Sequence, residues 1–429
     1  MPQNDLAAPT AQECRPDAER EAALMSALPA QVAAARRTPA FAETLSGVDP
    51  SSVRSRADLA RLPVIRKSEL LERQRSQRAT DPMGGFSAIG WRGLRGLAGA
   101  RRVFQSPGPI YEPEGEASDY WRMSRAMRAA GFAAGDLVHN SFSYHLTPAG
   151  SMMETGAHAL GCTVFPGGVG NADLQLEAIA DLRPDAYAGT PSFLRILAER
   201  ADETGRSIAS IGRALVSGEA FPAALRDRLA ARGIQALQCY ATADVGLIAY
   251  ETSAQEGLVL DESVIVEIVR PGTGDPVATS AAGVAPEVGE VVVTVLNPNY
   301  PLIRFGTGDL SAFLPGSCPT GRTAPRIRGW LGRADQTAKV RGMFVHPSQV
   351  AEVLRRHPEV ARARLVIAGE MADDRMTLRA ECPARPEGLA EALARSLRDV
   401  TKLRGEVELC DPGHLPNDGL VIDDTRKPA

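Results

Sequence analysis

The hydrophobic pattern divides the chain into stretches with different periodicity. Residues 17–48 carry apolar positions at helical spacing, which predicts an amphipathic helical start followed by a Ser/Pro-rich turn region. From about residue 136, short apolar runs bounded by turn residues alternate with helix-length segments. This alternation predicts a mainly parallel sheet covered by helices, in which ligands usually bind beyond the carboxyl ends of the strands.

The pattern changes after about residue 246, where apolar runs are separated by turn residues alone. This part predicts an antiparallel β region. A Gly/Pro/Arg-rich passage then leads to a helix at 347–356, two strands, a helix at 387–402 and a last strand, which together form a small α+β module. We therefore expect an α/β protein with a large N-terminal domain, residues 1–334, and a small C-terminal α+β domain, residues 335–429.

Length and charge narrow the class of protein. The chain has 429 residues and a net charge of -4, so several domains are expected and no general attraction for nucleic acid or anionic membranes. No apolar run approaches the roughly 18 residues of a membrane span, and the first residues lack the features of a secretory signal. The six cysteines form no CxxC pair, which argues against a disulfide framework or a zinc site. We expect a cytoplasmic protein.

Two segments at predicted strand ends carry candidate chemistry. In "VSGEAFP" (216–222), small residues would let a flat ring approach the backbone, although an ordinary strand–helix turn is the alternative. In "YATADVG" (240–246), Asp244 follows a strand and could coordinate Mg²⁺, which favours carboxylate and phosphate oxygens. A helix N-cap is the competing interpretation of Asp244.

Two further segments lie closer to the C-terminus. In "RFGTGDL" (304–310), Asp309 could accept hydrogen bonds from both hydroxyls of a ribose, or close an Asx turn. The loop "GRADQTAKVRG" (332–342) places Arg333 and Asp335 between the predicted domains, where a solvated linker is the alternative. His145 follows a predicted strand, and a structural or substrate-contact role is favoured over catalysis.

In their order and spacing these segments resemble the adenylate-forming enzymes, and most closely the phenylacetate–CoA ligase branch. The densest match runs over residues 301–354, with others at "GTPSFL" (189–194) and "VELCDPGHLPNDG" (407–419). The resemblance extends from about residue 60 to the end. It implies an enzyme that joins an aryl or acyl carboxylic acid to ATP, leaving an acyl-AMP, and then forms the CoA thioester after the mobile C-terminal domain rotates.

The resemblance also implies roles for individual residues. Asp244 would hold Mg²⁺, Asp309 and Arg333 the ribose hydroxyls, and Asp335 would be the hinge, with Asp244, Arg333 and Asp335 as the catalytic set. The nucleotide, ATP and then AMP, would also contact Gly218, Glu219, Ala220, Tyr240, Ala241 and Thr242. The acid would contact Phe142, Tyr144, His145 and Met152. CoA is the expected second substrate. No zinc is expected, because only Cys318 is present where some relatives have paired cysteines, and the branch is compatible with a homodimer.

The segment "FQSPGPIYEPEGE" departs from the family pattern at the expected phosphate loop. It has three prolines without N–H groups, and three glutamates where the triphosphate should lie. Like charges about 4 Å apart repel by about 4 kcal/mol at an effective dielectric near 20. The sequence therefore predicts a degenerate phosphate loop. Its residues are Ser106, Pro107 and Gly108, and its glutamates are Glu112, Glu114 and Glu116.

Two more departures bear on activity. Leu420 stands where the family has its catalytic lysine, and Asp244 replaces the usual Glu at the metal position. Removing a preorganised cation commonly lowers the rate by orders of magnitude. Three hypotheses follow: an ATP-dependent acid–CoA ligase, a descendant with weak or no adenylation that keeps the thioester half-reaction or only binds ligand, and a scaffold protein.

Overall fold

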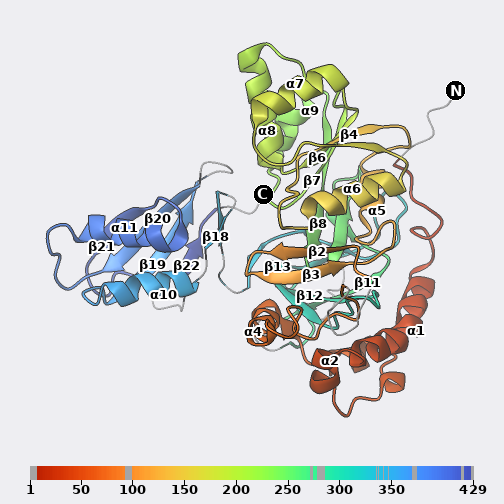
Figure 1. Ribbon diagram of the computed structural model, residues 1–429, viewed down its shortest axis with the longest axis horizontal. Helices are drawn as coiled ribbons and strands as arrows, with labels where there is room; N and C mark the ends of the chain where they lie inside the picture. Colours follow the sequence, from red (N-terminus) through yellow and green to blue (C-terminus); the bar gives the residue numbers. More distant parts are fainter. Residues whose placement is uncertain are drawn as a thin grey trace. The chain divides into compact units, whose positions relative to one another are not determined.

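The computed structural model describes residues 7–91, 99–270, 274–277, 286–334, 336, 338–341, 343–345, 347–369, 374–416 and 420–426. The chain forms two compact units, Met1–Leu331 and Gly332–Ala429 (Figure 1). The α/β fold class predicted from the sequence is confirmed in both. None of the described helices is long and apolar enough to cross a membrane.

A parallel sheet forms one half of the large unit. Its strands lie in the order β5–β4–β6–β7–β8. They are β4 (Leu137–Asn140), β5 (Thr163–Pro166), β6 (Ala186–Gly189), β7 (Arg213–Val216) and β8 (Gln235–Thr242). The predicted strand–helix alternation is thereby confirmed.

Helices cover both faces of this sheet. They are α5 (Met123–Ala129), α6 (Ala149–Ala159), α7 (Ala172–Leu182), α8 (Pro191–Thr204) and α9 (Ala223–Ala230). The strand order reverses after β5, so right-handed connections put α6 on one face and α7, α8 and α9 on the other. Figure 1 shows α7, α8 and α9 grouped together, with α5 beside α6.

The predicted antiparallel region follows and is also confirmed. Strand β8 pairs with β9 (Gly246–Glu251), and the sheet continues through β10 (Leu258–Leu260), β15 (Arg326–Ile327) and β14 (Phe313–Leu314). A second sheet has the order β1–β13–β12–β11. Its strands are β1 (Ile65–Arg66), β11 (Val264–Val269), β12 (Gly289–Val295) and β13 (Phe305–Ser311).

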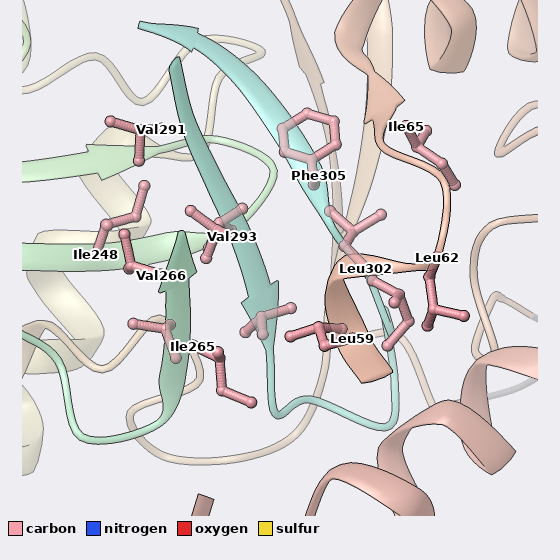
Figure 2. Packing of buried hydrophobic residues seen from close by; sticks show 14 of the residues in the cluster. Leu59, Leu62, Ile65, Ile248, Ile265, Val266, Val291, Val293, Leu302 and Phe305 are labelled. Atoms are coloured by element: carbon pink, nitrogen blue, oxygen red, sulfur yellow. The ribbon is translucent and has the colours of Figure 1, made fainter. Parts of the chain in front are cut away.

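The main apolar core lies on this second sheet. Figure 2 shows Val293 of β12 and Phe305 of β13 beside Leu59 and Ile65 from the N-terminal segment. All four side chains are almost completely buried. The core therefore fixes residues 59–65 against β13, where Ile65 and Arg66 pair with Phe305 and Gly306 in parallel.

The N-terminal part departs from the prediction in detail. The stretch 17–48 forms two helices, α1 (Asp17–Arg36) and α2 (Pro39–Thr44), followed by a 3₁₀ turn (Pro50–Ser52), α3 (Arg56–Ala60) and α4 (Lys67–Gln77). The expected phosphate loop is a β-hairpin of β2 (Arg102–Ser106) and β3 (Ile110–Glu114).

The small unit has its own core. The predicted helices are α10 (Pro347–Arg356) and α11 (Leu389–Thr401), and the predicted strands are β19 (Arg362–Ala368), β20 (Arg375–Glu381) and β21 (Glu406–Cys410). The sequence did not predict β22 (Ile422–Asp424), which completes the sheet order β21–β20–β19–β22. It also missed the hairpin of β17 (Ala338–Val340) and β18 (Met343–Val345). The short β16 (Gly332–Arg333) begins the unit.

Candidate active site

The hairpin corrects the prediction of a glutamate-lined loop. Its turn contains only residues 107–109, whereas Glu112 and Glu114 lie in strand β3 with no exposed surface, and Glu116 is exposed beyond the strand. Ser106 is buried at the end of β2. The three carboxyl groups therefore do not gather at the turn, and the repulsion expected there is absent.

The turn itself is held by the C-terminal end of α4. The Arg75 guanidinium donates to the Gly108 carbonyl oxygen (2.8 Å), and Arg78 donates to the Pro109 carbonyl oxygen (3.3 Å). Arginine side chains thus bind the backbone oxygens of the turn. These contacts fix the hairpin against α4.

Glu114 is compensated by a complete set of donors. Its carboxylate accepts from Arg102 Nη1 (2.6 Å), from the Ser151 hydroxyl (2.6 Å) and from Trp121 Nε1 (2.8 Å). Buried charges are stable only with such partners. Glu114 is therefore tied into the structure and carries no uncompensated charge towards a ligand.

Glu112 has a different environment, beside Asp244 of the β8–β9 turn. Asp244 is 3% exposed, and its Oδ2 accepts from Lys67 Nζ at 2.9 Å. Burial and the neighbouring charge of Asp244 raise the pKa of Glu112 to about 8, against the opposing effects of Lys67 and the Ser106 hydrogen bonds. Burial beside Asp244 therefore favours the protonated form of Glu112, and Lys67 pairs with Asp244.

One oxygen of this cluster is unsatisfied. Asp244 Oδ1 is buried and has no hydrogen-bond partner within the described part of the chain. The nearby Tyr300 hydroxyl is also buried without a partner there, and burial together with the charge of Asp244 raises its pKa. Such orphaned buried groups are uncommon in proteins and point to a ligand.

Lys67 was missed by the sequence analysis. It is the first residue of α4, and Arg66 before it binds Glu290, whose other oxygen accepts from the Gly308 N–H (3.3 Å). Positive charges are unfavourable at a helix N-terminus, so a basic pair in that position was a usable signal that the charges serve another purpose. The strand pairing of β1 with β13 places this basic pair beside the predicted ribose segment.

The structure brings together two of the predicted nucleotide residues. Tyr240 donates from its hydroxyl to Asp309 Oδ2 (2.9 Å), and Trp330 Nε1 donates to Asp309 Oδ1 (3.1 Å). The Asp309 N–H in turn donates to the Thr307 hydroxyl (3.1 Å), which helps to hold the loop. The Asp309 carboxylate of β13 is thereby held in a fixed orientation towards Tyr240 of β8.

The other nucleotide candidates follow β7 and β8. Gly218 has φ +83°, which an L side chain adopts only with strain, and Ala220 follows two residues on. Glu219 accepts from the Ser192 hydroxyl at the start of α8 (2.9 Å). Ala241 and Thr242 end β8, where the Thr242 hydroxyl accepts from the Val245 N–H (3.2 Å).

The predicted acid-binding residues are divided between different environments. Tyr144 lines a cavity of about 320 Å³ at the carboxyl ends of β4 and β5. Phe142 and Met152 are buried in an apolar core cluster, and His145 is exposed. The cavity is lined by Arg102, Phe104, Tyr144, Thr147, Ser151, Glu154 and Pro166.

Comparison with known proteins assigns the chain to a family, although no protein-family model matches it. The phenylacetate–coenzyme A ligase of Aromatoleum evansii is 29% identical over 393 residues, covering 85% of this chain and 84% of the relative. The phenylacetate–coenzyme A ligase of Escherichia coli (strain K12) is 30% identical over 323 residues, covering 72% of this chain and 69% of the relative. The chain belongs to the phenylacetate–CoA ligase family.

The fold of the chain is also similar to solved structures of a CoA ligase. A 2-hydroxyisobutyryl-CoA ligase in complex with 2-HIB-AMP and CoA, in its thioesterification state, has a TM-score of 0.79 at 25% identity, covering 99% of this chain and 94% of that chain. An open conformation of that enzyme has a TM-score of 0.69 at 25% identity, covering 96% of this chain and 95% of that chain.

The remaining phenylacetate–CoA ligase positions lie in the small unit. Asp335 is outside the described residues, and of Arg333 only the backbone is described, in β16. Leu420, which the sequence analysis assigned to the family's lysine position, has 40% of its surface exposed. Lys67, the cation described above beside Asp244, belongs to the large unit.

Proposed function

We propose that the chain activates a carboxylic acid with ATP and transfers the acyl group to CoA. The acid's carboxylate oxygen attacks the α-phosphorus, the bond to pyrophosphate breaks, and an acyl-AMP forms. The CoA thiolate then attacks the acyl carbon, and AMP leaves. The observation that carries the proposal is the partly buried Lys67–Asp244 ion pair beside Glu112 of the hairpin, in which Asp244 Oδ1 has no hydrogen-bond partner among the described residues.

Lys67 supplies the cation that neither the hairpin turn nor Leu420 provides. Its ammonium group is held by Asp244 Oδ2, with one-third of the Lys67 side chain exposed (33%). A positive charge fixed in advance in a partly buried site stabilises charge that develops on phosphate oxygens, without reorganisation during the reaction. Lys67 therefore favours departure of pyrophosphate.

Mg²⁺ is the metal that Asp244 fits. Its buried Oδ1, which has no hydrogen-bond partner in the part of the chain that the structure describes, is a hard oxygen ligand, the kind that Mg²⁺ prefers. Among the described residues no group of three or more His, Cys, Asp or Glu side chains is arranged to hold a metal, so nucleotide phosphates and water would complete the shell. When bound, the ion would neutralise part of the triphosphate charge.

The ribose end of the site favours a nucleotide. Asp309 is held on both oxygens, by Tyr240 and by Trp330, so its carboxylate has one fixed orientation. A carboxylate in this position can accept hydrogen bonds from the two ribose hydroxyls. The adenine would then lie against the backbone near Gly218, where the absence of a side chain allows close approach.

The test is AMP release from ATP·Mg²⁺ and CoA across a panel of aryl and short acyl acids. It is run on the native protein and on Leu420→Lys, and acyl-AMP is supplied directly in a parallel assay. We expect acid-dependent AMP and thioester from the native protein, and a faster first step from Leu420→Lys because the variant adds a cation.

The outcomes separate the proposed function from the half-reaction alternative. AMP from Leu420→Lys alone would restrict the native chain to the thioester step, a candidate that Leu420 itself favours. If neither protein forms AMP and supplied acyl-AMP is not converted to thioester, the proposed ligase activity is wrong.

A further inference from the structure

The cavity next to α6 is connected to the Lys67–Asp244 site by one face of the hairpin. Arg102 pairs with Glu114 and Phe104 pairs with Glu112 across the two strands, so these four side chains share a face. Arg102 and Phe104 line the cavity, whereas Glu112 adjoins Asp244. Alternate residues of a strand lie about 7 Å apart, so the cavity and the Glu112–Asp244 pair are close neighbours along the hairpin.

The cavity walls are polar as well as aromatic. Arg102 uses Nη1 for Glu114 and for the Ser151 hydroxyl (3.0 Å), and its Nη2 lies 3.9 Å from Glu154 Oε1, too far for a hydrogen bond. Counting formal charges, two carboxylates surround one guanidinium. The lining therefore keeps an excess of negative charge on the side of Glu154.

Two successive hydrogen bonds link Asn140, Tyr144 and Glu154 at this side of the cavity. Asn140 Nδ2 donates to the Tyr144 hydroxyl (2.7 Å), so that hydroxyl uses its own proton towards Glu154. Burial, and the charge and hydrogen bond of Glu154, raise the pKa of Tyr144. Glu154 is 22% exposed, and its carboxylate has more acceptor sites than the Tyr144 hydroxyl can fill, which leaves acceptor capacity for a ligand.

We infer that the acid activated by this chain carries a hydrogen-bond donor, an amino or hydroxyl group, at the end remote from its carboxyl group, and that Glu154 accepts this bond. The inference rests on the proposed function and adds the substrate class to it. A purely apolar acid would displace water from Glu154 without replacing the hydrogen bonds that the water gives, which carries a desolvation cost. A second carboxylate at the remote end would meet Glu154 as a like charge.

The experiment compares matched acids in the AMP-release assay and in thermal stabilisation of the protein. The probes are phenylacetate with its ring-amino, ring-hydroxy and ring-carboxy derivatives, and butanoate with its chain-hydroxylated derivatives. The proteins are the native chain, Glu154→Leu, Glu154→Gln and, as a control, Glu177→Gln, which changes an exposed glutamate of α7.

We expect the donor-bearing acids to exceed their unsubstituted parents by about tenfold or more in kcat/KM, since a polar site discriminates strongly against a ligand that lacks the matching group. Glu154→Leu should remove this preference. Glu154→Gln should reduce it, most strongly for the acids that carry an amino group. Glu177→Gln should leave it unchanged. The melting temperatures of the variants without ligand report whether they are folded.

Failure of the inference and failure of the function are distinguishable. If phenylacetate and butanoate are used as well as their derivatives, and the Glu154 variants do not change the ratio, the inference is overturned and the ligase function stands. If no acid yields AMP with the native chain or with Leu420→Lys, and supplied acyl-AMP gives no thioester, the function is overturned. In that case the thermal measurements still test the cavity assignment. Donor-bearing acids that stabilise the native chain but not Glu154→Leu support it. Stabilisation that is equal in both proteins, or absent, overturns it.

Discussion

Two buried glutamates of the large unit differ in the partners that surround them. Glu13 of the N-terminal segment is 1% exposed, and its carboxylate is bound by Arg322 (3.1 Å), Arg128 (3.2 Å), the Tyr250 hydroxyl and both donors of Thr10 (2.8 Å each). Burial disfavours its charge, but the hydrogen bonds of Tyr250 and Thr10 and the charge of Arg322 outweigh burial and lower the pKa to about 2.

Glu112 also has no exposed surface, but its pKa moves in the opposite direction, to about 8. Both of its oxygens accept hydrogen bonds from Ser106, yet burial and the charge of Asp244 outweigh the opposing effects of Lys67 and Ser106. The comparison shows that the charge of the neighbours, an arginine at Glu13 and a carboxylate at Glu112, helps to separate the two pKa values. Glu13 anchors the fold, whereas Glu112 belongs to the cluster in which Asp244 Oδ1 has no hydrogen-bond partner among the described residues.

The largest expected effect comes from removing the cation beside Glu112. Lys67→Met leaves Asp244 without its ion-pair partner and removes the charge proposed to act on the phosphates. AMP formation should fall by about 10²–10³-fold, as for loss of a preorganised donor. The measurement is initial rate with saturating acid and ATP, with Lys402→Met, an exposed lysine of the small unit, as the control. A rate within about threefold of the native one would show that Glu112 and Asp244 lie outside the reaction site.

The next effect tests the anchoring role of Glu13. Glu13→Gln leaves Arg322 buried without its charged partner, and we expect the free energy of unfolding to fall by about 3 kcal/mol at pH 7. Because the folded pKa is lowered, the stabilisation by Glu13 is present above the unfolded pKa and is lost as the pH falls towards 2. Urea unfolding should therefore show the difference between the two proteins shrinking by about 1.4 kcal/mol between pH 7 and about pH 3.5. A difference that does not depend on pH would contradict the role of the charge.

Glu112→Gln should change the free energy of unfolding in the opposite direction, towards higher stability. The folded pKa of Glu112 is raised, so its ionisation destabilises the protein progressively between the ordinary pKa of 4.5 and about 8. Glutamine keeps the shape and the contact with Ser106 without the charge. Relative to the native protein, the variant should gain about 2–3 kcal/mol in unfolding free energy from pH 6 to about pH 9. Equal unfolding curves at both pH values would mean that Glu112 is ionised throughout.

The smallest effect concerns the ribose end. Tyr240→Phe removes a side-chain donor that helps to orient Asp309, worth about 1 kcal/mol. We expect the KM for ATP to rise by about fivefold with kcat nearly unchanged. A Ser207→Ala change, in an exposed turn, is the matched loss of a hydroxyl. If KM for ATP does not change, Asp309 is oriented by Trp330 without help from Tyr240.

The regular periodicities were sufficient for the sheet framework and for the small unit. Helix α10 begins and ends at the predicted residues, because its apolar positions repeat cleanly and the Gly/Pro-rich passage isolates it. The antiparallel region was equally clear, since its strands are β-branched runs between turn residues. Local sequence decides such elements.

The hairpin and Lys67 could not be predicted in the same way. Prolines and glutamates are poor strand formers, so residues 102–114 looked like a loop, and only tertiary partners such as Arg102, Ser151 and Trp121 make burial of Glu114 possible. Lys67 meets Asp244 across 177 residues of chain, a contact that no local pattern contains. The sequence therefore misjudged where the charges of the hairpin lie, and it did not bring Lys67 to Asp244.

The Glu13–Arg322 ion pair has a consequence for the order of events during synthesis. The two residues are 309 positions apart, so the N-terminal segment leaves the ribosome long before its partner exists. Until Arg322 and Thr323 have emerged, Glu13 cannot make its ion pair with Arg322, nor its backbone hydrogen bond with Thr323. Closing this contact is possible only after nearly all of the large unit has been made. Burial of Glu13 thus reports that the unit is complete.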